Sequence, residues 1–183
     1  MLDSENEFRE LIKLPGQDTG TQSASTTLAF SPNERLLASA NKTSTVRVWD
    51  WAAGTMVADI CSVASSNFFS VAFLDDARIA AGNHEGRVLV FNLNKLSEHE
   101  ATLHGAHSKP VWALAALGTV LVSGSEDGTV AIWDTASFTL TKSIICDDAV
   151  GVIMLRSDSE IFVGVSGRHV AEFSSKKDGV QGT

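Results

Sequence analysis

The stretch that decides the fold covers residues 103–134 and reads LHGAHSKPVWALAALGTVLVSGSEDGTVAIWD. Short apolar runs in it are separated by two brief connections, at 117–118 and 125–128, and it ends on a Trp-Asp pair. Each connection contains a glycine, which supplies the positive φ that a tight turn between antiparallel strands demands. The stretch therefore predicts three consecutive strands of one antiparallel sheet.

The end of this stretch recurs along the chain at intervals of 42, 42 and 40 residues. The recurring pairs are Trp49-Asp50, Phe91-Asn92, Trp133-Asp134 and Phe173-Ser174. A period in this range predicts a propeller of four-stranded blades. The runs before each pair are near-continuous and rich in Val, Ile, Phe and Ala, as expected of strands that neighbouring blades cover on both faces. We therefore expect an all-β chain.

The period also predicts how the chain is divided. An N-terminal segment, 1–25, holds a possible closing outer strand, and residues 175–183 form a polar tail. Between them we expect four repeats, at about 26–67, 68–109, 110–149 and 150–174.

Residues 103–134 closely resemble a WD40 repeat, and the resemblance extends from Leu28 to Phe173. It implies a WD40-type β-propeller of about four blades, as a partial or small ring. It also implies a non-catalytic scaffold that binds partner proteins or peptides through the propeller loops. Within the third repeat it implies a hydrogen-bonded structural tetrad of His107, Ser123, Asp127 and Trp133.

The tetrad would work as a chain of donors and acceptors. Asp127 would accept from the imidazole of His107, and the imidazole would link to the Ser123 hydroxyl, which accepts from the Trp133 indole N–H. A half-satisfied buried network costs more than an apolar replacement, and the other repeats lose several members together. Their terminal aromatic residues are Trp49, Phe91 and Phe173. We expect only the third blade to be held in this way.

The number of blades raises the question of ring closure. Four blades lie at the lower end of the propeller range. The chain could be a segment of a longer propeller, a part-ring completed by another chain, or a true four-bladed ring. An open array would expose two apolar blade faces and unpaired strands, which predicts self-association.

Composition limits the partners and the compartment. The net charge is −8, and the 14 Lys and Arg residues form no long basic run, which argues against direct nucleic-acid binding. No apolar run approaches the ~18 residues of a membrane span. The N-terminus has no secretory signal, so we expect an intracellular protein of the cytoplasm or nucleus, with Cys61 and Cys146 as buried free thiols.

An enzymatic or metal-dependent function is the third alternative. The candidate ligands His84, Glu85, His99, His104 and His107 do not have the spacing typical of zinc sites. In the family-like geometry the Ser123 hydroxyl is buried, so that Ser, His and Asp would not serve as a catalytic triad. We expect no catalytic residue, no metal and no cofactor.

The runner-up function is a propeller module of a larger signalling or regulatory protein, such as a ubiquitin-ligase substrate receptor. Receptors of this fold that dock on the cullin-4 adaptor often carry Arg two residues after the Trp-Asp pair. Ala52 and Ala136 stand there in this chain, which argues against that role.

A partner face is expected where the loops before each first strand meet the turns between second and third strands. The side chains that we assign to it are Glu85, Lys109, Glu126, Asp147 and Asp148. Four of these five are acidic and lie in equivalent loops. We therefore expect the face to hold a peptide that carries Lys or Arg, although loops are generally rich in charged residues.

Overall fold

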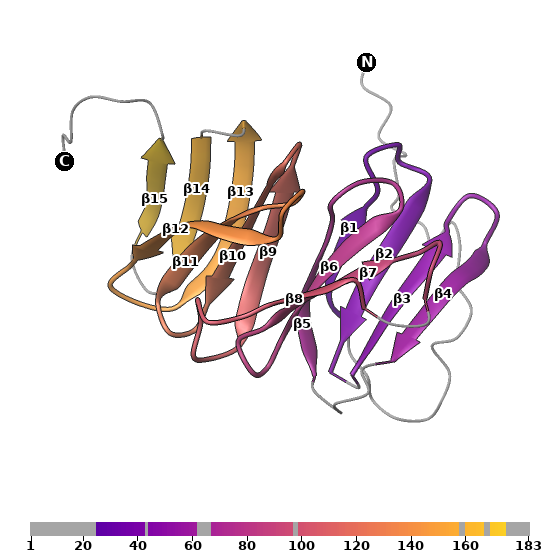
Figure 1. The fold of residues 1–183 in the computed structure, drawn as a ribbon, viewed down its shortest axis with the longest axis horizontal. Helices are drawn as coiled ribbons and strands as arrows, with labels where there is room; N and C mark the ends of the chain where they lie inside the picture. Colours follow the sequence, from indigo (N-terminus) through magenta and orange to yellow (C-terminus); the bar gives the residue numbers. More distant parts are fainter. Residues whose placement is uncertain are drawn as a thin grey trace, which may run out of the picture.

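The computed structural model describes residues 25–42, 44–61, 67–96, 99–157, 160–166 and 169–174, and these contain strands and turns but no helix (Figure 1). None of them therefore forms a helix that could cross a membrane. The strands of the first two sheets are β1 (Ser25–Phe30), β2 (Leu36–Asn41), β3 (Thr45–Asp50) and β4 (Thr55–Cys61), then β5 (Phe68–Phe73), β6 (Arg78–Asn83), β7 (Val88–Asn92) and β8 (Ala101–Leu103). Those of the other two are β9 (Val111–Leu117), β10 (Val120–Ser125), β11 (Thr129–Asp134) and β12 (Thr139–Ile145), then β13 (Val150–Ser157), β14 (Glu160–Val165) and β15 (His169–Ser174).

Each sheet is an antiparallel meander in chain order, and we call the sheets blades 1 to 4. The first strand of every blade is the inner one, and the blades stack because β5 packs on β1, β9 on β5 and β13 on β9. The repeating architecture is that of part of a WD40-type propeller. The N-terminal segment with its expected closing strand and the polar tail lie outside the described residues.

A bulge recurs at the start of each first strand. Val111 pairs with Ser125 and Ala113 with Gly124, which leaves Trp112 unpaired between them. The same register shift leaves Phe69 unpaired in blade 2. A bulge turns the extra side chain out of the regular alternation, so these two aromatic residues take a direction that their neighbours do not.

The hydrophobic core lies between the blades, not within them. Val46 and Val48 of blade 1 share a cluster with Phe68, Val71 and Phe73 of blade 2. Two further clusters join blade 2 to blade 3 and blade 3 to blade 4. One blade therefore depends on its neighbours for the burial of its apolar faces.

Glycine at one position of the second strand allows this stacking. A Cβ added to Gly82 would lie 2.7 Å from Cγ1 of Val111 in the next blade, and one added to Gly124 would overlap Val150. These glycines are required by the close approach of the following strand and not by backbone conformation.

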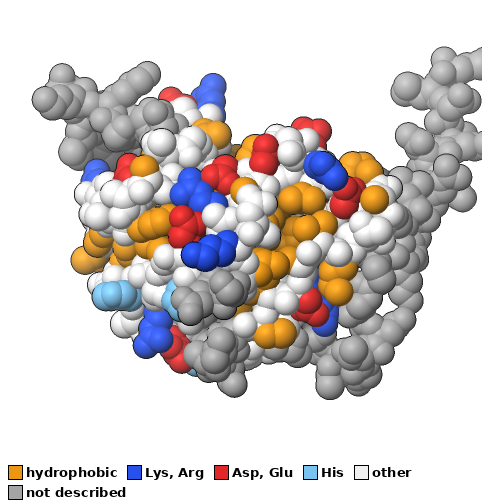
Figure 2. Space-filling view, turned by 45° about the vertical axis from the view of Figure 1, so that its right-hand side comes forward, with side chains coloured by type: hydrophobic (Ala, Val, Ile, Leu, Met, Phe, Trp, Pro, Cys, Tyr) orange, Lys and Arg blue, Asp and Glu red, His pale blue; other side chains and the backbone are white. Residues whose placement is uncertain are grey.

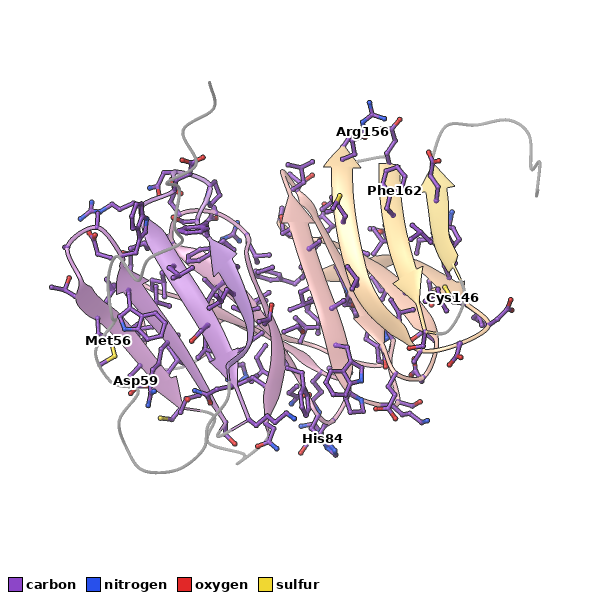
Figure 3. The ribbon with its side chains drawn as sticks, turned by 180° about the vertical axis from the view of Figure 1, so that it is seen from behind. Met56, Asp59, His84, Cys146, Arg156 and Phe162 are labelled. Carbon is purple, nitrogen blue, oxygen red and sulfur yellow. The ribbon has the colours of Figure 1, made fainter. Side chains whose placement is uncertain are left out.

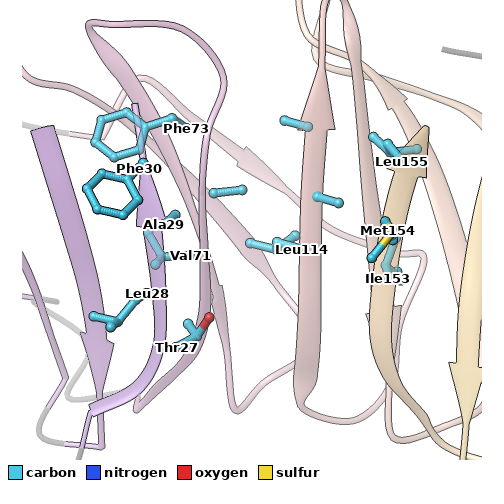
Figure 4. A pocket seen from close by; sticks show the side chains of 13 residues that line it. Thr27, Leu28, Ala29, Phe30, Val71, Phe73, Leu114, Ile153, Met154 and Leu155 are labelled. Atoms are coloured by element: carbon cyan, nitrogen blue, oxygen red, sulfur yellow. The ribbon is translucent and has the colours of Figure 1, made fainter. Parts of the chain in front are cut away.

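The stack is open between its first and last blades. The four inner strands line a hollow of about 320 Å³, with Leu28 and Phe30 on one side and Met154 on the other (Figure 4). Figure 2 shows hydrophobic side chains reaching the surface among charged ones in the middle of that view. The expected burial of the two cysteines is wrong: Cys61 ends the outer strand β4 and is exposed, and Cys146 follows the outer strand β12 and is partly exposed.

The turn between β2 and β3 predicts a stabilising substitution. Ser44 has a φ of 62°, at the position where Gly86 and Gly128 stand in the turns of the next two blades. Left-handed backbone costs about 1–2 kcal/mol for a residue with a Cβ. We expect Ser44→Gly to raise the free energy of unfolding by about 1 kcal/mol in chemical denaturation, whereas an unchanged or lower value would contradict this reading of the turn.

Candidate protein-interaction face

A hydrogen-bonded chain runs through blade 3 from a buried indole to a carboxylate. The Trp133 indole N–H donates to Ser123 Oγ at 2.8 Å, and the Ser123 hydroxyl lies 2.6 Å from His107 Nε2. On the other side of the ring, His107 Nδ1 lies 2.5 Å from Thr129 Oγ1, and the Thr129 hydroxyl donates to Asp127. Since Asp127 can only accept, the consistent assignment places the imidazole proton on Nδ1.

The sequence-based prediction of a direct hydrogen bond between Asp127 and His107 is wrong, because the Thr129 hydroxyl lies between them. One Asp127 oxygen accepts from the Ser108 backbone N–H and hydroxyl, at 2.5 and 3.0 Å. The other accepts from the backbone N–H of Thr129 at 2.9 Å as well as from its hydroxyl. An Asp that bonds the backbone two residues on is an Asx-turn, so the pattern Asp-Gly-Thr was the signal that could have revealed Thr129.

The surroundings of Asp127 and His107 determine the protonation state of these two members of the hydrogen-bonded network. Burial alone would raise the pKa of Asp127, but donation by Ser108 and Thr129 outweighs it and holds that pKa far below its usual range. Burial lowers the pKa of His107 below 6.5, although the Asp127 charge opposes the shift. The network therefore contains a neutral imidazole and a carboxylate.

The network ties the loop before β9 to the turn between β10 and β11. His107 and Ser108 belong to the loop, Asp127 belongs to the turn, and Thr129 is the first residue of β11. The backbone N–H of Glu126 also donates to the Pro110 carbonyl, at 3.0 Å. Both segments lie at one end of the blade, and that end is consequently held in a defined conformation.

The other blades use different groups at the positions of the tetrad. In blade 2 the Phe91 ring packs edge-on against Phe68, with ring centroids 6.3 Å apart, beside the buried Ala81. In blade 4 Phe173 packs against the cluster shared with blade 3. In blade 1 Trp49 is buried. The equivalents of Asp127 in blades 1 and 4, Thr43 and Gly167, lie outside the described residues.

The five side chains that the sequence assigned to a partner face are all exposed at the same end of their blades. Lys109 and Glu126 form an ion pair of 3.7 Å, so the structure brings these two together. Glu85 pairs with Arg87 of its own turn at 2.9 Å. The other two of the five assigned residues, Asp147 and Asp148, lie in the loop before β13.

Two aromatic side chains that the sequence analysis did not assign to this end, Phe69 and Trp112, lie there beside His84. Trp112 and Phe69, the two bulge residues, pack against each other with ring centroids 4.5 Å apart and ring planes tilted by 45°, and the His84 ring centroid lies 6.1 Å from that of Phe69. Trp112 is 38% exposed, and its indole N–H donates to Glu126 at 3.2 Å. We define the 84/112 face as Phe69, His84, Lys109, Trp112 and Glu126. Figure 3 shows His84 at one end of the strands and Arg156 at the opposite end.

The 84/112 face combines aromatic and charged side chains. Two aromatic rings, one carboxylate and one ammonium group meet there. Among the described side chains no three His, Cys, Asp or Glu residues converge as metal ligands. His107 belongs to the buried network, and His99 packs against Phe91.

Comparison with known proteins identifies the repeat. A family model for the WD domain, G-beta repeat, matches residues 10–50 and 97–134. Two segments of the chain therefore match WD40 repeats. Proteins of this family are generally scaffolds and not enzymes, and they bind other proteins.

The chain resembles segments of several longer proteins. It is 27% identical to "Protein tipD" of Dictyostelium discoideum over 154 residues, which are 84% of this chain and 24% of that protein. It is 26% identical to "Protein ROOT INITIATION DEFECTIVE 3" of Arabidopsis thaliana over 117 residues, 60% of this chain and 26% of that protein. It is 32% identical to a "p21-activated protein kinase-interacting protein 1-like" of Xenopus laevis over 79 residues, which are 43% of this chain and 21% of that protein. The chain thus spans about a quarter of the length of these relatives.

Two solved structures of computationally designed proteins share the fold. The chain matches the Ika4 protein with a TM-score of 0.75 and 26% identity, over 92% of this chain and 99% of Ika4. It matches the Ika8 protein with a TM-score of 0.71 and 26% identity, over 85% of this chain and 47% of Ika8. The four blades therefore follow the course of just under half of Ika8.

The network predicts a non-additive pair of substitutions. Ser123→Ala leaves both the Trp133 N–H and a ring nitrogen of His107 without a partner, and we expect it to lower the free energy of unfolding by about 2–4 kcal/mol. Adding Trp133→Phe recreates the Ala and Phe found in blade 2 and removes one of the orphaned groups. The double variant should therefore lose less than the sum of the two single losses in chemical denaturation, and strict additivity would contradict the network.

The buried imidazole predicts acid sensitivity. The pKa of His107 is below 6.5 in the folded chain. The neutral imidazole therefore contributes its full stabilisation at pH values above the pKa of His107 in the unfolded chain, and this stabilisation is lost as the pH falls through the lowered pKa of the folded chain. We expect Tm to fall on acidification from about pH 7.5 to about pH 5. His107→Asn should reduce this dependence, while the matched control His104→Gln, in the exposed loop, should keep it. Equal acid sensitivity of both variants would contradict the assignment.

Proposed function

We propose that the chain is a non-catalytic interaction scaffold that binds a short basic peptide at the 84/112 face. The observation that carries this proposal is Trp112, which is exposed at a bulge, packs against the Phe69 ring and donates its indole N–H to Glu126. An exposed Trp that is held in one orientation is typical of the residues that dominate binding energy at protein interfaces.

The chemistry of the face favours a Lys or Arg side chain as the anchor of the peptide. A cation over the face of a Trp ring gains a cation–π interaction, and the carboxylate of Glu126 lies at the ring edge. Lys109 is the present partner of that carboxylate, at 3.7 Å and with an exposed side chain. A surface ion pair of this kind is worth little, so an incoming cation can replace Lys109 at small cost.

The buried network of blade 3 supports the same proposal. It fixes the turn that carries Glu126 and the loop that carries Lys109, and a site held in its bound conformation loses less entropy when a partner binds. The name of one relative, a p21-activated protein kinase-interacting protein, also describes a protein that interacts with another protein.

A second candidate function is that of a propeller module within a larger regulatory protein. It is favoured by the comparison of lengths, because the chain corresponds to about a quarter of each relative. In that case the 84/112 face would recruit a partner to activities located in other domains.

Selection from a library of random short peptides displayed on phage tests the proposal. We expect the selected peptides to be enriched in Lys or Arg. Trp112→Ala should weaken binding of the best synthetic peptide by about thirtyfold, which corresponds to the ~2 kcal/mol of an aromatic hot spot. Reversing the charge of Glu85 and Glu126 together should weaken it further, and added salt should weaken binding to the native face.

Trp51→Ala is the matched control for this experiment. Trp51 is 41% exposed and also donates its indole N–H, to the Glu34 carbonyl, but it follows β3 at the opposite end of its blade. Its replacement should leave peptide binding unchanged. Peptides without a basic residue, or equal losses from both Trp variants, would contradict the proposal.

A further inference from the structure

The strand register defines equivalent positions in the four blades. Leu28 pairs with Ser39, Val71 with Ala81 and Ile153 with Val163, so Leu28, Val71 and Ile153 hold one position of the first strand. In the same way Phe30 of blade 1 corresponds to Phe73 of blade 2. Differences in burial between equivalent residues therefore report which blade faces have a neighbour.

Blade 1 exposes the face that every other blade turns toward its predecessor. Leu28 is 63% exposed, whereas Val71 is 3% and Ile153 9% exposed. Phe30 is 57% exposed, whereas Phe73 is 6% exposed. The sequence of blade 1 thus retains the large apolar residues of an interface whose other half is not found among the described residues.

Blade 4 exposes the opposite kind of face, the one that earlier blades turn toward their successor. Val152 and Met154 are 63% and 64% exposed, and Val170 on β15 is 70% exposed. The equivalents of Val170 in blades 2 and 3, Val88 and Val130, are fully buried. Leu28 and Met154 lie on opposite sides of the hollow between the inner strands (Figure 4).

The glycine that receives the following blade is also present in blade 4. Gly164 holds the position of Gly82 and Gly124. The three atoms nearest to a Cβ added to Gly164 all belong to Val152 of its own blade, the closest at 3.3 Å. Blade 4 therefore keeps the glycine at which Val111 and Val150 pack in the earlier junctions, but no described strand of another blade packs there.

The two open faces carry opposite charges at matching positions of their third strands. Between blades 1 and 2 these positions hold Val48 and Leu89, which share one apolar cluster. At the open ends the corresponding positions hold Glu172 on blade 4 and Arg47 on blade 1. Arg47 lies 3.5 Å from Asp59, but its buried Nε has no hydrogen-bond partner among the described residues.

We propose that two copies of this chain join head to tail, with blade 1 of each packed on blade 4 of the other, and so close a ring of eight blades. The apolar residues Leu28 and Phe30 of one copy cover Val152 and Met154 of its partner, and Arg47 reaches Glu172 across each junction. A head-to-tail contact closes only if the rotation per copy completes the circle. One arc matches 47% of the Ika8 chain, so two arcs together have about the extent of one Ika8 chain.

The mass of the chain in solution, measured by light scattering after size exclusion, tests the proposal. We expect a species of twice the 19.4 kDa chain. Leu28→Glu and Met154→Glu change exposed residues at the two ends, and each should give a folded monomer. Ile145→Glu is the matched control, because Ile145 is 84% exposed on β12 but belongs to neither open face, and this variant should remain a dimer.

A charge exchange distinguishes head-to-tail pairing from other dimers. Glu172→Arg and Arg47→Glu should each weaken the dimer at least tenfold, and the double variant, which restores opposite charges across both junctions, should recover it. A native chain that stays monomeric at all concentrations, an open-ended polymer, a dimer insensitive to Met154→Glu, or a double variant weaker than both single variants would each overturn the proposal.

Discussion

The structure depends on one constraint, which is that a blade cannot bury its own apolar faces. Val46 and Val48 are buried because blade 2 covers them, and Gly82 and Gly124 allow the next first strand to approach closely. Most of the hydrophobic stabilisation therefore arises at junctions between blades. The same constraint explains the two ends of the arc, where residues equivalent to buried ones are exposed.

Polar interactions hold the residues beside the junction of blades 2 and 3 in defined positions. The hydrogen-bonded network lies beside the junction of blades 2 and 3 and runs from Trp133 through Ser123, His107 and Thr129 to Asp127. Each polar side chain that it buries has a hydrogen-bond partner within it. It also holds the loop and turn that carry the 84/112 face. Rigidity in the interior and recognition at the surface thus have a common origin, since the residues that order the blade also position the residues that meet a partner.

Periodicity predicted the strands and blades well, because alternation and turn glycines are local properties of the sequence. The bridging role of Thr129 was missed, since a hydroxyl two residues after an Asp can serve either the backbone turn or a neighbouring ring. The packing of Trp112 against Phe69 could not be predicted from the pattern of apolar residues, because it results from a bulge that shifts the register by one residue. Ring closure depends on curvature, which a repeat length does not specify.

Hydrogen exchange at the four second strands tests the central claim most directly, in a chain kept monomeric by a substitution at an open face. These strands have the same local structure, but β6 and β10 belong to blades with neighbours on both faces, whereas β2 and β14 belong to the terminal blades. If packing between blades provides the stability, amides of β6 and β10 exchange most slowly, and those of β14 exchange fastest. Equal protection of all four strands would show that each blade is stable by itself and would contradict the account.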